Sequence, residues 1–535
     1  MWQHNYTPLA GSLGFSALVA ALPIFVLLYL LGVKRKPAWV AALSGLVAAA
    51  AVALLVYRMP AGAMIGAVGY GAAFGLFPIG WVVFCAILLY RITLETGKFE
   101  IVKDSVGSLT DDRRLQALLI AFAFGAFIEG AAGFGTPVAV SAAMLTGLGF
   151  SPFYAAGICL LANTAPVAFG SIGTPILALS TVTFLPKEAL SAWVGRICAP
   201  ISLIVPAYLL AVMGGWRALK GVLLGAVVCG VSFSATQVLV SNFIGPELTD
   251  ILSSLAALGS LVLLFLLWKP KDKFDLEGHS APPVVAKRHP AGELLLAWAP
   301  YLILVGMVLV WGFYKTELSK VSLVFPWPGL DKQILQMPPV TAKPAPYSAV
   351  YRFDWLSASG TACLIASLLS ALLLRMSLAQ FFKVLATTTK QLALSMLTIA
   401  SVLALAFLMN YCGATATMGL AFAATGVLFP FFSSLLGWLG VFLTGSDTSA
   451  NALFGNLQVV TAGRLGLDPV LMAASNSSGG VMGKMISLQS IAVAAAATGM
   501  KSEDEAKLFR FTLRHSIILA SVIGLITMLY SALTR

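Results

Sequence analysis

Long apolar runs recur along the whole of this 535-residue chain, and they constrain its fold more than any other feature. A helix needs about 20 predominantly apolar residues to cross a bilayer. Runs of that length lie at residues 12–33, 38–57, 63–90, 188–212, 219–241, 249–268, 292–313, 355–374, 391–411 and 516–533. With the more interrupted stretches between them, we expect about 12–14 transmembrane helices.

The composition agrees with an all-α polytopic membrane protein. Hydrophobic residues make up 59% of the chain and charged residues only 10%, and the mean hydropathy is +0.93. Because the runs are continuously apolar and do not alternate, they predict helices and not the strands of a membrane barrel. The net charge of +12 comes from basic residues spread over short loops, so we expect a lipid bilayer and no nucleic acid as the partner.

The basic residues also predict how the spans are oriented. Loops rich in Lys and Arg face the cytoplasm, and the basic clusters lie at 34–36, 91–114, 269–288, 375–390 and 501–514. The amino terminus and the Pro-, Trp- and Tyr-rich insert 314–354 would then lie outside. No positive charge precedes the first apolar run, so we expect it to stay as the first span instead of acting as a cleaved signal peptide.

The chain is predicted to consist of two membrane halves. The boundaries are 1–268 for the amino-terminal half, 269–291 for a charged cytoplasmic linker and 292–535 for the carboxy-terminal half, which carries the external insert. Each half is expected to hold one unit of broken helices, at 115–185 and at 435–500, where Gly, Pro, Ser, Thr and Asn interrupt the apolar sequence.

Two pairs of matching stretches suggest that these units form an internal repeat. "GAFIEG" (125–130) resembles "GVFLTG" (440–445), and "LGFSP" (148–152) resembles "LGLDP" (465–469) at nearly the same spacing. An Asn among small residues follows each match. Repeats of this kind build many secondary transporters, often with the copies inverted, and the sequence leaves the orientation of these copies open.

Glycines are predicted to break the helices of both units. Unwound backbone at membrane depth is tolerated only where protein or water surrounds it. Discontinuous helices there present half-helix amino termini and free carbonyls to substrates and ions. The predicted break glycines are Gly130, Gly133, Gly135, Gly173, Gly445, Gly479, Gly480 and Gly483.

Two acidic residues in these units are candidates for proton coupling. Glu129 follows Leu115 by about four helical turns, which puts it near mid-membrane if the helix starts at the surface. An ionised carboxylate is costly there, and binding a proton removes the cost. Asp447 stands near the corresponding place in the second unit. The alternatives are a structural carboxylate tied to the Gly-rich backbone for Glu129, and a helix-capping role for Asp447.

Lys484 is the leading candidate for binding an anionic substrate. A buried lysine needs an anion beside it, and either Asp447 or a substrate carboxylate would serve. The alternative is a lysine that extends to the membrane surface. Hydroxyl and amide side chains could also bind the substrate, although such groups often join transmembrane helices instead. The further substrate-binding candidates are Asn163, Thr136, Thr174, Asn451, Asn476 and Ser477.

Other chemistry has little support in the sequence. The six cysteines lie within apolar runs without paired spacing, so we expect neither disulfides nor a metal site, and no cofactor. The four histidines are predicted to lie in loops or at the edge of a span, which leaves no intramembrane ligand for haem. Without a P-loop or a soluble catalytic domain, the chain is expected to be a secondary transporter and not an enzyme.

Four stretches closely resemble signature stretches of the bacterial lactate permease family, and the similarity covers nearly the whole chain. They are "FIEGAAGFGTPVAV", "LANTAPVAFGSIGTP", "LTGSDTSANALFGNLQ" and "SNSSGGVMGKMIS". The resemblance implies a multi-pass protein of the bacterial cytoplasmic (inner) membrane that imports L-lactate, and often D-lactate and glycolate, by proton symport. The residues alone leave open a sodium-coupled carboxylate carrier and, in a different class, the membrane subunit of a respiratory complex.

Overall fold

The structure, a computed structural model, describes residues 1–133, 135–270, 274, 289–500 and 502–534. In this part of the chain, 11 helices are long and apolar enough to cross a membrane, or up to 13 if each of two bent pairs counts as one span. The bent pairs are α1 (Leu13–Ala20) with α2 (Leu22–Gly32), and α10 (Pro152–Ala162) with the segment Val167–Thr183. The predicted all-α polytopic class is therefore confirmed.

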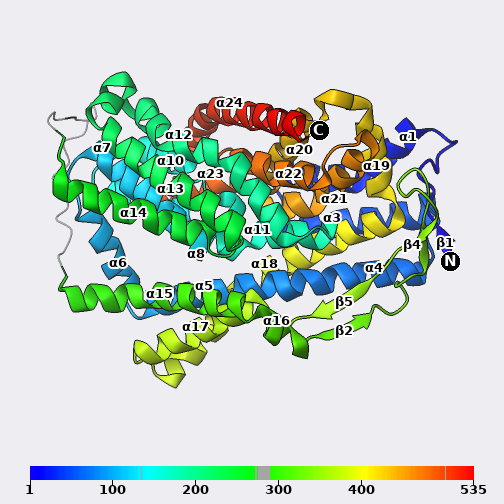
Figure 1. Ribbon diagram of the computed structural model, residues 1–535, viewed down its shortest axis with the longest axis horizontal. Coiled ribbons are helices and arrows are strands. Elements are labelled where there is room, and N and C mark those ends of the chain that lie inside the picture. Colours follow the sequence, from blue (N-terminus) through cyan, green and yellow to red (C-terminus); the bar gives the residue numbers. More distant parts are fainter. Residues whose placement is uncertain (134, 271–273, 275–288, 501, 535) are drawn as a thin grey trace.

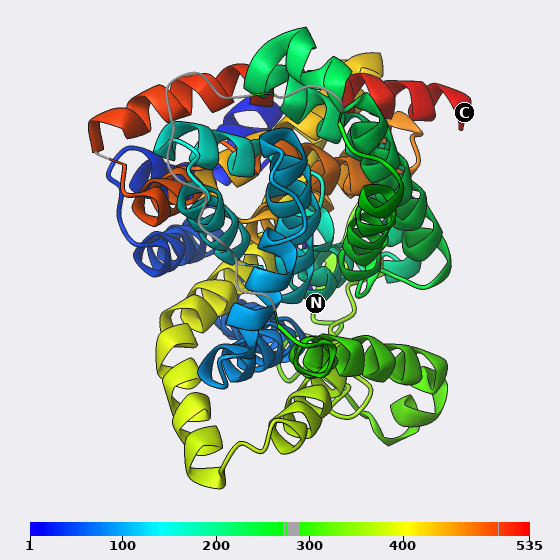
Figure 2. The same ribbon diagram turned by 90° about the vertical axis from the view of Figure 1, so that its left-hand side faces the viewer.

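The helices form two layers, which are separated most clearly in the turned view (Figures 1 and 2). The smaller layer contains α4 (Ala61–Phe74), η2 (Gly75–Gly80), α5 (Trp81–Glu95), α15 (Ala291–Phe313), α17 (Ser359–Leu373) and α18 (Leu378–Cys412). Next to it, α3 (Ala38–Ala51) and η1 (Val52–Val56) continue from α2, and α6 (Lys98–Gly107) follows α5. Because α2 packs on α20 while α3 packs on α18, this amino-terminal hairpin contacts both layers.

The larger layer holds the two units that the sequence singles out. The elements of the first unit and its neighbours are α7 (Arg113–Gln116), η3 (Ala117–Phe124), α8 (Gly125–Ala131), α9 (Thr136–Gly147), α10, η4 (Val167–Phe169), α11 (Gly170–Thr183), α12 (Lys187–Gly221), α13 (Leu223–Phe243) and α14 (Thr249–Leu267). Those of the second are α19 (Ala414–Phe422), η6 (Ala423–Leu428), α20 (Phe429–Thr444), α21 (Asp447–Leu465), α22 (Pro469–Lys484), α23 (Leu488–Thr498) and α24 (Ser502–Leu533).

Both units run through the same order of elements. In the first, α8 ends at a break, α9 and α10 follow as a hairpin, and a second break precedes α11; in the second, α20, α21, α22 and α23 repeat this order. The third helix of each unit starts with a proline after a capping residue, Ser151 or Asp468, whose side chain accepts a backbone N–H bond. Helix α9 packs against α23, and α11 packs against α21, so the units interlock.

The centre of the larger layer is shielded from lipid. Every residue from Arg114 to Ala131 is buried by protein, because α9, α10, α11 and α14 surround η3 and α8. This burial explains how an acidic residue and glycines are tolerated in an otherwise apolar segment, since their surroundings are protein and not hydrocarbon.

Short strands form a cap on the molecule. The sequence predicts the external insert but not its strands. They are β1 (Trp2–Gln3), β2 (Leu323–Pro326), β3 (Ile334–Gln336), β4 (Ala345–Pro346) and β5 (Val350–Phe353), accompanied by α16 (Lys315–Leu318) and η5 (Ser319–Val321). Strand β1 pairs in parallel with β3, and β3 with β4 and β2 with β5 pair antiparallel. The amino terminus therefore lies beside β3 and β4 of the insert 314–354, at the right in Figure 1, while α16, where the insert begins, lies nearer the middle.

The basic clusters gather away from this cap. Helices α6 and α7 lie at the left end of Figure 1, Lys383 Nζ lies 3.7 Å from Glu95 Oε1, and the Arg114 guanidinium lies over the Phe274 ring. Three predicted clusters therefore adjoin one another, as the predicted topology requires. Which end faces the cytoplasm stays a prediction from the positive-inside rule, and most of the predicted linker 269–291 lies outside the described residues.

Candidate functional site

A cavity of about 70 Å³ lies where the breaks of the two units meet. Five segments line it: the end of α8 and the break after it with Glu129 and Gly133, the η4–α11 stretch with Val167, Gly170, Ser171, Thr174 and Pro175, the α20–α21 break with Gly445–Thr448, the end of α22 with Lys484, and the start of α23 with Gln489. Sites for drug-sized ligands start at about 300 Å³. This one therefore suits a small molecule of a few heavy atoms.

Glu129 reaches this cavity from α8 with only 4% of its surface exposed. Its Oε2 has no hydrogen-bond partner among the described residues. A Cβ atom on Gly170 would lie 2.5 Å from Glu129 Oε1, so the carboxyl fits only because this residue is glycine. Lys484 lines the same cavity as the Glu129 carboxyl.

Asp447 supplies the second carboxyl and is 3% exposed. Its Oδ2 accepts hydrogen bonds from Ser477 Oγ at 2.6 Å and from Asn451 Nδ2 at 3.3 Å, while Oδ1 is unpartnered among the described residues. The capping role is taken by its neighbour, because the Ser446 side chain accepts from the backbone N–H of Ser449. Asp447 is therefore held by α22 and is not the cap of its own helix.

Lys484 ends α22 and is 8% exposed, so it does not extend to the membrane surface. Its Nζ donates to the carbonyl oxygen of Gly445 at 2.6 Å. Within the described chain it makes no ion pair, although Glu129 and Asp447 both lie within electrostatic reach. An ammonium group has three donors, which leaves two of them for a ligand.

Two helices begin at the cavity. Helix α21 starts at Asp447. Helix α11 becomes regular only near Thr174, after Ser171, Ile172 and Gly173 adopt left-handed backbone angles (φ 46°, 58° and 71°). Left-handed φ values at two residues other than glycine are strained, and such strain clusters at functional sites. The free N–H groups at helix starts favour an anion next to them.

The structure does not bring every predicted residue to the cavity. Thr174 lines it and donates its hydroxyl to Ser171 O at 2.6 Å. Asn451 and Asn476 instead form a buried network, in which Asn476 Nδ2 donates to Asn451 Oδ1 at 3.0 Å. Ser477 bonds to Asp447 and not to the cavity, and Thr136 starts α9 outside it. Thr136, Asn451, Asn476 and Ser477 therefore position helices or the Asp447 side chain.

The predicted break glycines divide into two groups. Gly133, Gly135, Gly173 and Gly445 have positive φ and lie at or beside interruptions of the helices. The prediction is wrong for Gly130, Gly479, Gly480 and Gly483, which lie within α8 and α22. They allow close helix contacts instead: a Cβ on Gly479 would lie 1.9 Å from Ser434 O of α20.

Sequence reasoning missed several residues at the site. Ser171, Thr448 and Gln489 line the cavity, but in the sequence they are ordinary polar residues beside helix ends. The expectation for the histidines needs a correction as well. His515 lies inside α24, with Nδ1 2.5 Å from the Tyr208 hydroxyl, because α24 is longer than the apolar run that marked it. His279 lies outside the described residues.

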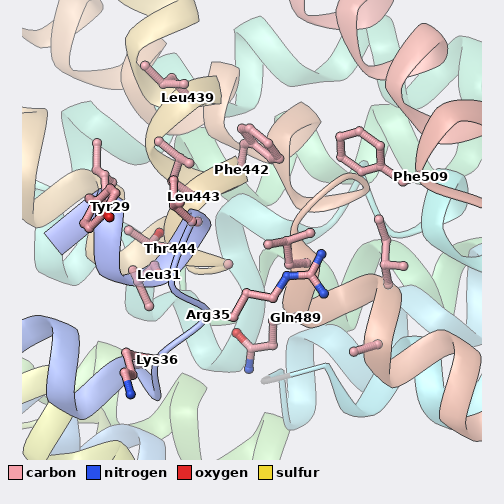
Figure 3. Close-up of a pocket in the computed structure, with 18 of the residues that line it drawn as sticks. Tyr29, Leu31, Arg35, Lys36, Leu439, Phe442, Leu443, Thr444, Gln489 and Phe509 are labelled. Carbon is pink, nitrogen blue, oxygen red and sulfur yellow. The ribbon is translucent and has the colours of Figure 1, made fainter. Parts of the chain in front are cut away.

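A second cavity of about 1510 Å³ adjoins the first, and Gly445 and Gln489 line both. Apolar side chains form most of its wall, among them Leu and Phe residues of α2, α20 and α24, and Arg35 points into the end where Gln489 lies (Figure 3). Lys36 and Arg510 also line it. The cavity therefore connects the basic clusters at 34–36 and 501–514 with the small polar site.

Residues 16–534 match the sequence profile of the family described as L-lactate permease. The chain is 48% identical to the L-lactate permease of Bacillus subtilis (strain 168) and 46% identical to Glycolate permease GlcA of Escherichia coli (strain K12), each alignment covering 99% of this chain and 98% of the relative. Among solved structures, Neisseria gonorrhoeae MtrF is similar at 12% identity and a TM-score of 0.47, over 89% of this chain and 85% of that one.

Proposed function

The chain belongs to the L-lactate permease family, and from this premise we propose that it imports lactate and close 2-hydroxy monocarboxylates such as glycolate together with protons. It would do so across the bacterial cytoplasmic membrane by alternating access, with the amino terminus and the cap outside.

The observation that carries this proposal is the charge of the small cavity. Two carboxyls, Glu129 and Asp447, face one ammonium group, Lys484, so the fully ionised site has one net negative charge. A bound monocarboxylate would add a second negative charge in a place where water cannot solvate it, which is costly. Binding a proton with each anion removes that cost, so the site favours joint binding of the two.

We assign the roles from the contacts at the site. Lys484 and the N–H groups at the starts of α11 and α21 bind the substrate carboxylate. Thr174 lines the cavity and its hydroxyl oxygen can still accept, so it is the candidate for the substrate hydroxyl. Asn163 is buried with its amide group unpartnered among the described residues, but it does not line the cavity. Glu129, with its unpartnered Oε2, takes the coupled proton, while Asp447 is held by Ser477 and Asn451 and stabilises the charge of Lys484.

The large cavity supplies the access route from the side of the basic loops. Arg35, Lys36 and Arg510 attract an anion toward it, and Gln489 stands where it meets the small site. Alternating access requires that this route close when the cap side opens. The broken helices of the two units meet at the site, so relative movement of the units is the motion we propose.

Uptake of radiolabelled L-lactate into proteoliposomes under an imposed pH gradient tests the proposal. The expected result is accumulation that stops when a protonophore collapses the gradient. Uptake that instead follows a sodium gradient, and is lost when choline replaces sodium, would show that sodium and not the proton is the coupling ion. A protein that equilibrates lactate without accumulating it would be a passive channel, and one that moves none would bring back the respiratory-subunit alternative.

A further inference from the structure

A third buried acid, Asp250, lies outside the roles assigned so far. It occupies the first turn of α14 and is 1% exposed. Neither of its carboxyl oxygens has a hydrogen-bond partner among the described residues. An ionised carboxylate buried without any partner is among the costliest arrangements a protein can contain, and binding a proton removes that cost.

Asp250 is adjacent to the helix that carries Glu129. A Cβ atom on Gly130 would lie 2.8 Å from Asp250 Cβ, so α8 and α14 touch at the residue that follows Glu129. Because Glu129 Oε2 is also unpartnered among the described residues, two incompletely bonded acids lie on helices that touch one residue from Glu129.

The charged surroundings of Asp250 are sparse. Helix α14 has no other ionisable residue, and among the elements packed against it α8 contributes only Glu129, while η3 and α11 contribute none. Helix α13, which also packs against α14, carries Cys229 as its only titratable residue. Among the described residues Asp250 has no ion-pair partner, whereas Glu247, three residues earlier, is paired with Lys187 and accepts from Ser359 Oγ at 3.0 Å.

We propose that Asp250 is a proton-transfer residue of the transport cycle, which exchanges the coupled proton with Glu129 on the cap side of the substrate cavity. The α13–α14 turn lies at the end of α14 opposite the linker, and Glu247 in that turn contacts Ser359 directly after the cap. A proton taken up there reaches Asp250 before Glu129. In the transfer, the O–H bond of Asp250 breaks, an O–H bond forms on Glu129, and water on the cap side reprotonates Asp250.

This inference rests on the proton coupling proposed above, so its test separates coupling from substrate movement. The variant Asp250→Asn keeps the size and polarity of the side chain but cannot carry a proton. We expect it to exchange internal for external lactate at the wild-type rate at equal pH, since exchange needs no net proton transfer. Its initial rate of net uptake under a pH gradient should fall well below the wild-type rate, because every net turnover needs a proton delivered to Glu129.

The matched control is Ser254→Ala, one turn further along α14, where a buried hydroxyl bonds only to Ile251 O. It should take up lactate at the wild-type rate. A wild-type rate of net uptake by Asp250→Asn, with an unchanged pH profile, would overturn the inference and leave Asp250 a permanently protonated structural residue. Failure of the wild type itself to accumulate lactate would instead reject the proposed function.

A measurement on the wild-type protein covers the case in which Asp250→Asn does not fold. An apolar carbodiimide reacts with buried protonated carboxyls, and mass spectrometry of the peptide that contains Asp250 quantifies the reaction. We expect labelling to decrease as the pH rises on the cap side, because a transfer residue exchanges its proton with that side. Labelling that is independent of pH would contradict the proposal.

Discussion

Lys484 Nζ lies 2.6 Å from the carbonyl oxygen of Gly445, which joins the end of α22 to the break between α20 and α21. The contact explains why a lysine is tolerated at this depth without an ion pair. The Gly445 carbonyl oxygen accepts one hydrogen bond from the ammonium group. The two other N–H donors remain for the cavity, which Lys484 lines together with Glu129 and Asp447. One cation therefore serves both units.

Replacement of this cation should weaken substrate binding. We expect Lys484→Met to raise the KM for lactate by about ten- to a hundredfold, because a hydrogen bond to a charged group contributes about 1.5–3 kcal/mol. Lys484→Arg should restore part of the affinity. The concentration dependence of uptake in proteoliposomes measures the effect, and the exposed Lys383→Met is the control. An unchanged KM in Lys484→Met would remove the lysine from the substrate site.

Loss of the Glu129 carboxyl should uncouple transport from the proton. Glu129→Gln fills the same space beside Gly170 but cannot take up a proton, so we expect it to exchange lactate and not to accumulate it under a pH gradient. Glu95→Gln, at the exposed partner of Lys383, should behave as the wild type. Accumulation by Glu129→Gln with the wild-type pH dependence would show that another group carries the proton.

The fold was predictable from sequence to the extent that its signals are local. An apolar run reports its own tendency to enter the membrane, so the spans follow from the sequence alone. Strand β1 has only two residues and pairs with a segment more than 300 positions later, which leaves no local signal. Likewise Asp250 looks like an acid in the first turn of any helix, and only the fold brings it to Gly130.

The glycines illustrate the same limit. A glycine that ends a helix and a glycine that lets two helices touch are identical in the sequence. Gly445 belongs to the first kind, with φ at 72°. Gly480 belongs to the second kind, because a Cβ there would lie 2.3 Å from Asp447 Oδ1, and this neighbour is 33 positions away. The two kinds of glycine can therefore be told apart only in the folded structure.

This distinction predicts how Gly479 responds to substitution. In Gly479→Ala the new Cβ would lie 1.9 Å from Ser434 O, and backbone cannot move aside easily, so we expect a loss of stability of about 1–3 kcal/mol or more. Gly463→Ala in α21 is the matched control, because nothing lies within 4 Å of its Cβ position, and alanine favours the helix. Thermal unfolding in detergent should separate the two; equal melting temperatures would contradict the close packing.

His4 should make the cap sensitive to acid. Its Nε2 lies 2.8 Å from Tyr411 O, and burial lowers the pKa of His4 from the usual 6.5 to about 4, although the bond to Tyr411 opposes this. The unfolded chain therefore takes up a proton first. The stabilisation is complete above pH 6.5 and is lost as the pH falls toward 4, by up to about 3 kcal/mol.

The variant His4→Gln can still donate to Tyr411 O but does not titrate. We expect its free energy of unfolding to depend less on pH between 6.5 and 4 than that of the wild type, and thermal unfolding across this range measures the difference. Identical pH dependence in the two proteins would show that His4 is not the group responsible.

The junction of the two cavities makes a prediction about access. Gln489 lines both the large cavity and the small site, whereas Ala492, one turn further along α23, lines only the large one. The six native cysteines are buried, so a single introduced cysteine can be followed.

A membrane-impermeant thiol reagent applied from the side of the basic loops should label both Gln489→Cys and Ala492→Cys. Lactate should slow the labelling of the first and leave the second unchanged, because only position 489 adjoins the bound substrate. Protection of both positions, or of neither, would contradict the route through the large cavity.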